Sequence, residues 1–193
     1  MRKQDDLTGI ILAGGKNIRM GQDKAFMKLG RKRLIDYSLD LMQTVTGRVI
    51  ISANKPGYDM FSVPVVQDNY LNIGPLGGME ACLRFSNTTG NLFMPCDTPF
   101  LTVDFWTLLL SNTGKYDAVI PISDNGKTEP LTGYYSREIL PKIVAQIEKG
   151  DYKVQNLLKK INTKFLPLEN PSLLKNINSP KDFGEATRET NNS

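Results

Sequence analysis

Residues 8–24 read Thr-Gly-Ile-Ile-Leu-Ala-Gly-Gly-Lys-Asn-Ile-Arg-Met-Gly-Gln-Asp-Lys, an apolar run that breaks into glycines and then into cations. The continuous run at Thr8–Leu12 is typical of a strand buried on both faces of a sheet. Gly14-Gly15 ends the run, and because glycine has no Cβ, backbone N–H groups there can approach a ligand closely. The cations that follow are Lys16, Arg19 and Lys24. The stretch therefore predicts a strand followed by a polyphosphate site, which indicates a bound nucleotide.

Two familiar phosphate-binding loops are excluded by the spacing. The P-loop needs Gly-Lys followed by Ser or Thr after four spacer residues, and the chain lacks it. The G-x-G-x-x-G fingerprint is missing because Gly14 and Gly15 are adjacent. The loop would therefore hold a triphosphate by charge as well as backbone, through Arg19 and Lys24, with bonds worth roughly 1.5–3 kcal/mol each. A glycine-rich surface turn with scattered cations is the alternative.

Composition is that of a soluble globular protein. The chain has 193 residues, of which 40% are hydrophobic and 23% charged, which is ordinary for one domain with its own core. We expect a single domain over residues 1–186 and a disordered tail at 187–193. The amino end does not resemble a signal peptide and no run reaches membrane-spanning length. We therefore expect a cytoplasmic protein with no membrane partner.

Charge and the lack of histidine exclude several classes of function. The net charge of +4 is spread along the chain apart from Arg31-Lys32-Arg33, which we assign to a solvated loop, so no nucleic-acid partner is expected. Without histidine there is no His-based triad and no imidazole ligand; a bound metal would be one that prefers oxygen, such as Mg²⁺. Cys82 and Cys96 lie in apolar surroundings, which favours free core thiols and a reducing compartment.

Runs with the character of strands alternate with runs of helical periodicity along most of the chain. Strands are expected at 8–12, 48–53, 63–66, 91–96, 117–122, 131–135 and 164–168. Helices are expected at 34–45, 76–85, 102–110 (capped by Thr102), 136–148 and 154–161, with a last short helix opening at Ser179-Pro180. The alternation predicts an α/β protein with a three-layer, Rossmann-like fold, in which helices cover both faces of a mostly parallel sheet.

Polar residues or glycines follow four of the expected strands. They are Gly14-Gly15, Asn54, Asp68 and Asp97. Ligands of open α/β sheets bind outside the carboxyl ends of the strands, so we expect these positions to meet at one cleft. Asn54 and Asp68 would each contact a base edge or a ribose hydroxyl, or would simply be turn residues.

Asp97 carries the next strongest signal. It lies in Pro95-Cys-Asp-Thr-Pro99, at the end of a buried strand and between two prolines. Because Mg²⁺ commonly takes one or two carboxylates together with substrate phosphates, we expect Asp97 to hold Mg²⁺. The alternative is that Asp97 only caps the helix that follows.

Two further segments are candidates for a second substrate. Gly74-Pro-Leu-Gly-Gly78 is a glycine-rich entry to a helix, which is a potential anion site or a plain tight turn. Asn176 and Asn178 place two amides on one side of an extended segment, although helix capping would also account for them.

These blocks together resemble a known family. The residues Leu12-Ala-Gly-Gly15, Arg19-Met-Gly21 and Asp23-Lys24 resemble the signature of the nucleotidyltransferase superfamily, which couples nucleoside triphosphates to phosphate acceptors. The later blocks narrow the resemblance to molybdenum cofactor guanylyltransferases of the MobA type. They are Ile51-Ser-Ala-Asn54, Gln67-Asp68, Gly74–Gly78, Pro95–Pro99 and Asn176-Ile-Asn-Ser-Pro180. The resemblance extends from about Gly9 to Phe183, nearly the whole chain.

The resemblance implies a nucleotidyltransferase fold and Mg²⁺-dependent transfer of GMP from GTP to the terminal phosphate of Mo-molybdopterin, with release of pyrophosphate. It implies nucleotide contacts at Leu12, Ala13, Gly14, Gly15, Lys24, Asn54, Asp68 and Asp97. It implies acceptor contacts at Arg19, Gly21, Gly74, Gly78, Asn176 and Asn178. The catalytic residues it implies are Lys24, Asp97 and Arg19, with Asp97 also the metal ligand.

The implied chemistry agrees with the composition. A terminal phosphate is anionic at neutral pH, so the step needs positioning and charge neutralisation rather than a general base. Glu129 before Pro130 departs from the family, in which many members carry Gln or His there. Two alternatives stay open: a relative that uses CTP or another phosphate acceptor, and a GTP-binding accessory protein without turnover. Cofactor-inserting chaperones or molybdoenzymes would be the protein partners.

Overall fold

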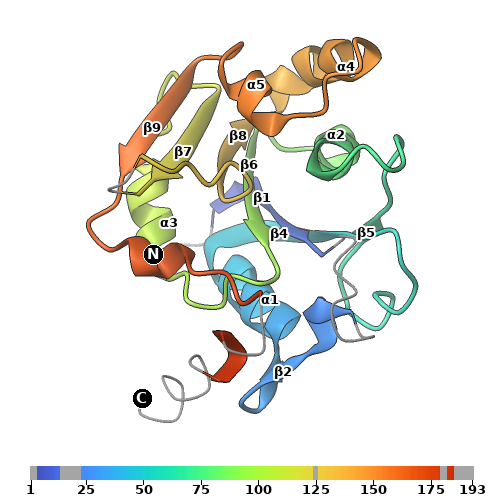
Figure 1. Cartoon of the computed structure of the whole chain (residues 1–193), viewed down its shortest axis with the longest axis vertical. Coiled ribbons are helices and arrows are strands. Elements are labelled where there is room, and N and C mark those ends of the chain that lie inside the picture. Colours follow the sequence, from blue (N-terminus) through green and yellow to red (C-terminus); the bar gives the residue numbers. More distant parts are fainter. Residues whose placement is uncertain (1–3, 14–22, 124–125, 179–181, 185–193) are drawn as a thin grey trace.

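A seven-stranded sheet forms the centre of the computed structural model, which describes residues 4–13, 23–123, 126–178 and 182–184 (Figure 1). Its spatial order is β5 (Val65–Val66), β4 (Thr46–Ser52), β1 (Gln4–Leu12), β6 (Gly90–Pro95), β8 (Gly133–Ser136), β7 (Ala118–Ile122) and β9 (Thr163–Pro167). The pairs β1–β4, β1–β6, β4–β5 and β7–β9 are parallel, whereas β8 runs antiparallel to β6 and β7. The expected α/β fold with a mostly parallel sheet is confirmed.

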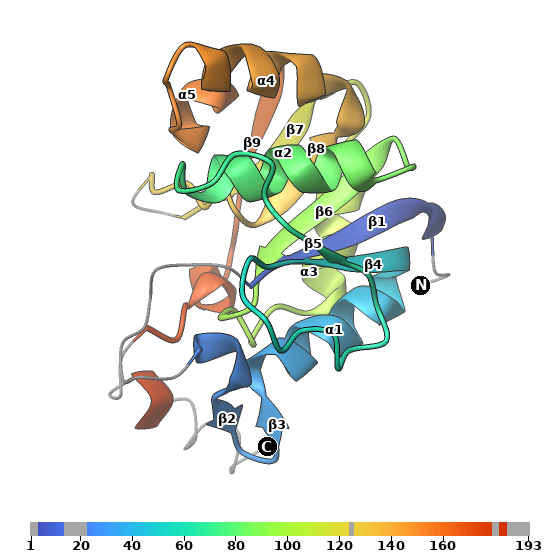
Figure 2. The same cartoon turned by 90° about the vertical axis from the view of Figure 1, so that its right-hand side faces the viewer.

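Helices cover both faces of the sheet, as expected (Figure 2). One face carries α1 (Leu34–Val45) and α3 (Val103–Leu110), and the other carries α2 (Pro75–Phe85), α4 (Leu140–Glu148) and α5 (Val154–Leu158). Side chains of β1 alternate between the two layers: Ile11 packs with α1 and α3, and Ile10 packs with α2. Burial on both faces explains the uninterrupted apolar run. None of the described helices is long and apolar enough to cross a bilayer.

Several expected boundaries differ from the structure. The strand expected at 63–66 is only β5, the strand expected at 131–135 is β8, and the helix expected at 154–161 ends at Leu158. The helix expected at 136–148 begins as the 3₁₀ turn η2 (Arg137–Ile139). Ser136 ends β8 and caps that turn by accepting a hydrogen bond from the Glu138 backbone N–H. The Thr102 cap is confirmed, whereas Ser179-Pro180 and the tail at 187–193 lie outside the described residues.

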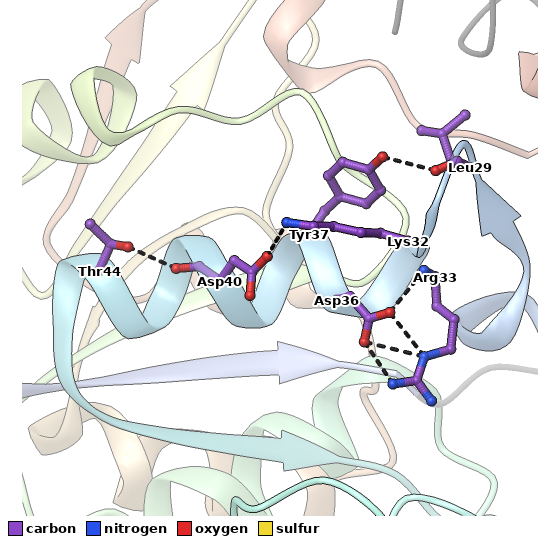
Figure 3. A network of polar contacts seen from close by, with 7 residues as sticks. All are labelled: Leu29, Lys32, Arg33, Asp36, Tyr37, Asp40 and Thr44. Atoms are coloured by element: carbon purple, nitrogen blue, oxygen red, sulfur yellow. Dashed lines mark hydrogen bonds and ion pairs between the residues drawn. The ribbon is translucent and has the colours of Figure 1, made fainter. Parts of the chain in front are cut away.

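The basic triplet, expected in a solvated loop, instead belongs to a β-hairpin built from β2 (Lys28–Leu29) and β3 (Lys32–Arg33). Figure 3 shows how this hairpin is fastened to α1. Lys32 Nζ lies 2.6 Å from Asp40 Oδ2, and Arg33 Nη2 lies 2.8 Å from Asp36 Oδ1. The Tyr37 hydroxyl donates to the Leu29 carbonyl oxygen at 2.8 Å. Two of the three cations are therefore engaged with carboxylates of this chain.

Cys82 and Cys96 are free thiols in the apolar layers, as the sequence predicts. Burial raises the pKa of the Cys82 thiol to about 12 and also raises the pKa of Cys96. Both side chains therefore remain protonated at neutral pH.

The chain after β9 returns to the carboxyl ends of the central strands, through the 3₁₀ turn η3 (Pro171–Leu174). Ile177 is 1% exposed and packs against Leu29 and Leu34, with Phe183 beside them. Both views place residues 182–184 beside the β2–β3 hairpin (Figures 1 and 2). The Ile177 backbone N–H donates to the Asp97 carbonyl oxygen at 2.9 Å. This contact brings the segment from Asn176 to Asn178 to the end of β6.

Candidate active site

The ends of four neighbouring parallel strands form one row. Leu12 is opposite both Ser52 and Pro95, and Ser52 is opposite Val66. Asparagine or aspartate follows two residues beyond β4, β5 and β6, at Asn54, Asp68 and Asp97. The strand register therefore places these three positions along one edge of the sheet, whereas Gly14 and Gly15 lie outside the described residues.

Lys24, Asp97 and Asn178 are in direct contact. Lys24 opens the 3₁₀ turn η1 (Lys24–Phe26), and its Nζ lies 2.5 Å from Asp97 Oδ2 and 2.6 Å from Asn178 Oδ1. Only 15% of the Lys24 side chain and 17% of the Asp97 side chain are exposed. Such shielding makes the charge pair less sensitive to salt than a surface pair would be. The structure thus joins residues that are 73 and 154 positions apart in sequence.

Two buried side-chain oxygens at this edge have no hydrogen-bond partner among the residues that the structure describes. They are Asp97 Oδ1 and Asn176 Oδ1. A buried acceptor left unpaired costs about 1–3 kcal/mol, so such atoms point to a missing partner. Among the described residues, no three His, Cys, Asp or Glu side chains cluster as a ready-made metal site. Any cation here would rest on Asp97 together with ligand oxygens.

A second cluster forms around Asp68. The Asp68 backbone N–H donates to Asn54 Oδ1 at 2.8 Å. A Cβ placed on Gly78 would lie 2.6 Å from Ser52 Oγ and 3.4 Å from Asp68 Oδ1. Glycine at this position therefore lets the first turn of α2 lie directly against the ends of β4 and β5. Gly74 is the residue before α2, and its φ of +78° is a conformation that favours glycine.

The environment of Asp68 opposes its ionisation. Burial raises the pKa of Asp68 above its usual value, and hydrogen bonding with Asn54 offsets only part of that rise. Because the folded state binds this proton more tightly than the unfolded state, the contribution of Asp68 to stability is full below its ordinary pKa and is lost as pH rises through its folded pKa. A carboxylate that weakens the fold at neutral pH, in a row of candidate ligand-binding residues, is typical of a functional position.

We expect Asp68→Asn to be more stable than the wild type at pH 7, because the neutral amide is not penalised by burial. The difference should shrink toward pH 3, where Asp68 is protonated in both states. Urea midpoints measured from pH 3 to pH 8 test this.

Asp117→Asn serves as the control with the opposite sign. A hydrogen bond from the Asn162 backbone N–H, helped by Lys142, lowers the pKa of Asp117. Stability from Asp117 is therefore present above its ordinary pKa and lost as pH falls through its folded pKa. Asp117→Asn should lower the urea midpoint at pH 7. An Asp68→Asn midpoint equal to or below that of the wild type at pH 7 would contradict the account of Asp68.

Of the other residues expected to contact the nucleotide or the acceptor, some lie within the described part of the chain and some lie outside it. Leu12 and Ala13 continue the strand edge: the Ala13 N–H donates to the Ser52 carbonyl oxygen at 2.9 Å, and the Leu12 carbonyl oxygen accepts from Cys96 N–H at 3.1 Å. Gly14, Gly15, Arg19 and Gly21 lie outside the described residues, so their assignments stay predictions.

Two residues of the site were missed by sequence reasoning. Ser52 ends β4 and faces Gly78, but as one residue of an apolar strand it gives no signal. The Tyr58 hydroxyl lies within hydrogen-bond distance of two acceptors, the Ala13 carbonyl oxygen at 2.9 Å and Asp23 Oδ2 at 3.0 Å. Tyr58 lies in the irregular segment between β4 and β5, where no periodicity indicates its burial.

Glu129 and a surface cavity are not part of the clusters around Asp97 and Asp68. Glu129, which departs from the family pattern, lies between β7 and β8 with its Oε1 2.5 Å from Lys127 Nζ. A cavity of about 560 Å³ is lined by residues such as Thr8, Arg48 and Phe85. These residues belong to the amino-terminal parts of β1 and β4 and to the end of α2. Neither Asp68 nor Asp97 lines this cavity.

The sheet order and the helices on both faces define an α/β fold with a mostly parallel sheet, and solved structures at 22% and 14% sequence identity share that fold. More specifically, the chain belongs to the family of MobA-like NTP transferase domains, which it matches over residues 9–164.

Individual relatives agree with this family. A probable molybdenum cofactor guanylyltransferase of Carboxydothermus hydrogenoformans is 34% identical over 185 residues, or 92% of this chain and 93% of the relative. A molybdenum cofactor guanylyltransferase of Vibrio parahaemolyticus is 30% identical over 181 residues, or 91% of this chain and 92% of the relative. The structure of molybdopterin-guanine dinucleotide biosynthesis protein A from Archaeoglobus fulgidus matches with a TM-score of 0.82 at 22% identity, over 96% of this chain and 100% of that one. That last likeness bears on the fold alone.

Proposed function

We propose that this protein transfers GMP from GTP to the terminal phosphate of Mo-molybdopterin, forming molybdopterin guanine dinucleotide and releasing pyrophosphate. Its family and the names of its relatives support this reaction. The observation that carries the proposal is the Lys24–Asp97 pair at 2.5 Å beside the end of β6. Transfer between two polyanions needs a cation and a carboxylate that can hold a metal at the same place.

Asp97 fits the Mg²⁺ that this chemistry implies. Its Oδ1 is buried and has no hydrogen-bond partner in the described part of the chain, while Oδ2 accepts from Lys24. Carboxylate and amide oxygens suit Mg²⁺, and a single carboxylate suffices when substrate phosphates complete the shell. When bound, Mg²⁺ would neutralise phosphate charge and favour departure of pyrophosphate.

Lys24 would supply positive charge at the phosphates. Its ammonium group has three donors, of which Asp97 and Asn178 engage two among the described residues. The third is then available for a phosphate oxygen. Asp97 and Asn178 thereby fix the direction of the Lys24 side chain before substrate arrives, which lowers the reorganisation needed during the reaction.

The proposed step is an in-line displacement. An oxygen of the acceptor phosphate forms a bond to the α-phosphorus of GTP, and the bond from that phosphorus to the α,β-bridging oxygen breaks. No proton has to be removed from the attacking phosphate at neutral pH. The chain's task is to hold both substrates in line and to balance the negative charge.

We assign the two halves of the cleft as the family resemblance implies. The nucleotide half comprises Leu12, Ala13, Gly14, Gly15, Lys24, Asn54, Asp68 and Asp97. The acceptor half comprises Arg19, Gly21, Gly74, Gly78, Asn176 and Asn178. Contact between Lys24 and Asn178 supports this division, because it places one residue of each half at a common boundary. The free thiols support a reducing compartment such as the cytoplasm, where chaperones or molybdoenzymes would receive the product.

The experiment is a transfer assay with Mo-molybdopterin and each of GTP, CTP, UTP and ATP, with and without MgCl₂. We expect pyrophosphate release and a guanine dinucleotide product with GTP and Mg²⁺ only. Equal turnover with CTP would contradict the guanylyl assignment. GTP binding without any pyrophosphate release in the presence of acceptor would favour an accessory protein.

A further inference from the structure

Tyr58 joins two parts of the chain that flank the expected phosphate loop. Its hydroxyl lies 2.9 Å from the carbonyl oxygen of Ala13, just after β1, and 3.0 Å from Oδ2 of Asp23, the residue before Lys24, and these two acceptors share its single proton. Tyr58 is only 1% exposed. The described part of the site therefore contains a buried phenol that links the strand edge to the turn bearing Lys24.

Asp23 transmits this link to Lys24. It is the N-cap of η1, and its Oδ1 accepts from the Ala25 backbone N–H at 3.2 Å. Its other oxygen accepts from Tyr58 and lies 3.8 Å from Lys55 Nζ. The distance to the exposed Lys55 ammonium group is longer than a hydrogen bond. Among the described residues, the Tyr58 hydroxyl is therefore the closer of these two polar groups to Asp23 Oδ2.

The Tyr58 ring also packs against the same turn. Phe26, the last residue of η1, lies with its ring centroid 5.0 Å from that of Tyr58, and Phe61 lies 6.2 Å from it on the same segment as Tyr58. The Tyr58 hydroxyl thus contacts the N-cap of η1 at Asp23, and the Tyr58 ring contacts its last residue, Phe26. The turn is three residues long and too short to be stable alone, so its position depends on such contacts.

We propose that Tyr58 is a positioning residue for Lys24. Through Asp23 and Phe26 it fixes η1 against the end of β1, so that the Lys24 ammonium group meets Asp97 and Asn178 in one geometry. This inference rests on the proposed function, in which Lys24 contacts the phosphates. Tyr58 itself touches no reacting atom in this account.

Tyr58→Phe is the decisive variant because it keeps the ring packing and removes only the hydroxyl. We expect it to lower the rate of pyrophosphate release about tenfold, since small displacements of a positioned group cost rate. The KM for GTP should change by less than about threefold if the loss lies in the transition state. The same substitution made in Lys24→Met should have little further effect, because coupled residues are non-additive.

Tyr135→Phe is the matched control. Tyr135 is fully buried and its hydroxyl likewise donates to a backbone carbonyl oxygen, that of Pro130. It belongs to the other apolar layer. We expect both variants to lower the melting temperature by similar amounts, while only Tyr58→Phe slows transfer.

Two results of the transfer assay would overturn the inference. One is a Tyr58→Phe rate no lower than that of Tyr135→Phe. The other is an equal fold-loss from Tyr58→Phe with Lys24 present and with Lys24→Met, which would indicate a role independent of Lys24. The same four-protein cycle, run on the free energy of unfolding by urea denaturation, needs no transfer: Tyr58→Phe should cost less stability in Lys24→Met than in the wild type, and an equal cost in both would overturn the inference. If the wild type binds GTP but transfers nothing, the proposed function fails while this cycle still decides the role of Tyr58.

Discussion

Asp97→Asn is expected to lower Mg²⁺-dependent pyrophosphate release by a factor on the order of 10³ or more, comparable to removal of a principal electrostatic group. Asparagine keeps the shape of the side chain but removes the negative charge and replaces one oxygen with an amino group. Oδ1 is buried and has no partner among the described residues of the wild type, and in asparagine this position would lose the negative charge that attracts a cation. Initial rates at increasing MgCl₂ concentration measure the effect, and higher Mg²⁺ should not restore the rate.

The control for this variant is Asp117→Asn. Asp117 also pairs with a lysine, Lys142 at 3.2 Å, and its side chain is 24% exposed, close to the 17% of Asp97. It should lose stability without losing the transfer rate. Near-normal turnover by Asp97→Asn would exclude Asp97 as the metal ligand and would leave its contact with Lys24 as its role.

The site's polar residues were predictable because they follow from strand order. In neighbouring parallel strands with aligned ends, the next turn residues meet at one edge, and the register row from Val66 to Pro95 fulfils this condition. The apolar runs located the carboxyl ends of β1, β4 and β6 to within one residue, although β1 begins at Gln4 rather than at Thr8. The residues Asn54, Asp68 and Asp97 could thus be grouped without any structure.

What could not be predicted depends on contacts between distant segments. The local sequence carries no signal that β8 runs antiparallel between β6 and β7. Its residues have the same strand propensity in either direction. The β2–β3 hairpin consists of strands of two residues, too short for a period to appear. The hydroxyl of Tyr58 contacts Ala13 and Asp23, which lie 45 and 35 residues away in sequence.

Lys24→Met is expected to lower the transfer rate about 10²-fold or more, because Lys24 would meet charge that develops in the transition state. Methionine keeps most of the aliphatic stem and removes all three donors. Loss of the ammonium group also leaves Asp97 Oδ2 and Asn178 Oδ1 without the donor they share. We therefore expect a lower free energy of unfolding as well, by about 1–3 kcal/mol. Single-turnover rates and urea denaturation measure the two effects.

Lys164→Met separates the role of Lys24 from the general effect of losing a half-buried lysine. Lys164 donates to Asn112 Oδ1 at 2.7 Å and lies over the Tyr116 ring, so its loss should reduce stability but not transfer. A slower rate in Lys164→Met equal to that in Lys24→Met would contradict the assignment.

Magnesium should also distinguish the two site variants from each other. In Lys24→Met the Asp97 carboxylate has lost its cation, and an uncompensated, mostly buried charge is costly. MgCl₂ alone should therefore raise the melting temperature of Lys24→Met more than that of the wild type, in which the ammonium group competes for Oδ2. It should leave Asp97→Asn unchanged. A larger rise in melting temperature for Lys24→Met, with none for Asp97→Asn, would show that Lys24 and a divalent cation bind the same carboxylate. Equal rises in all three proteins would show that the cation binds elsewhere.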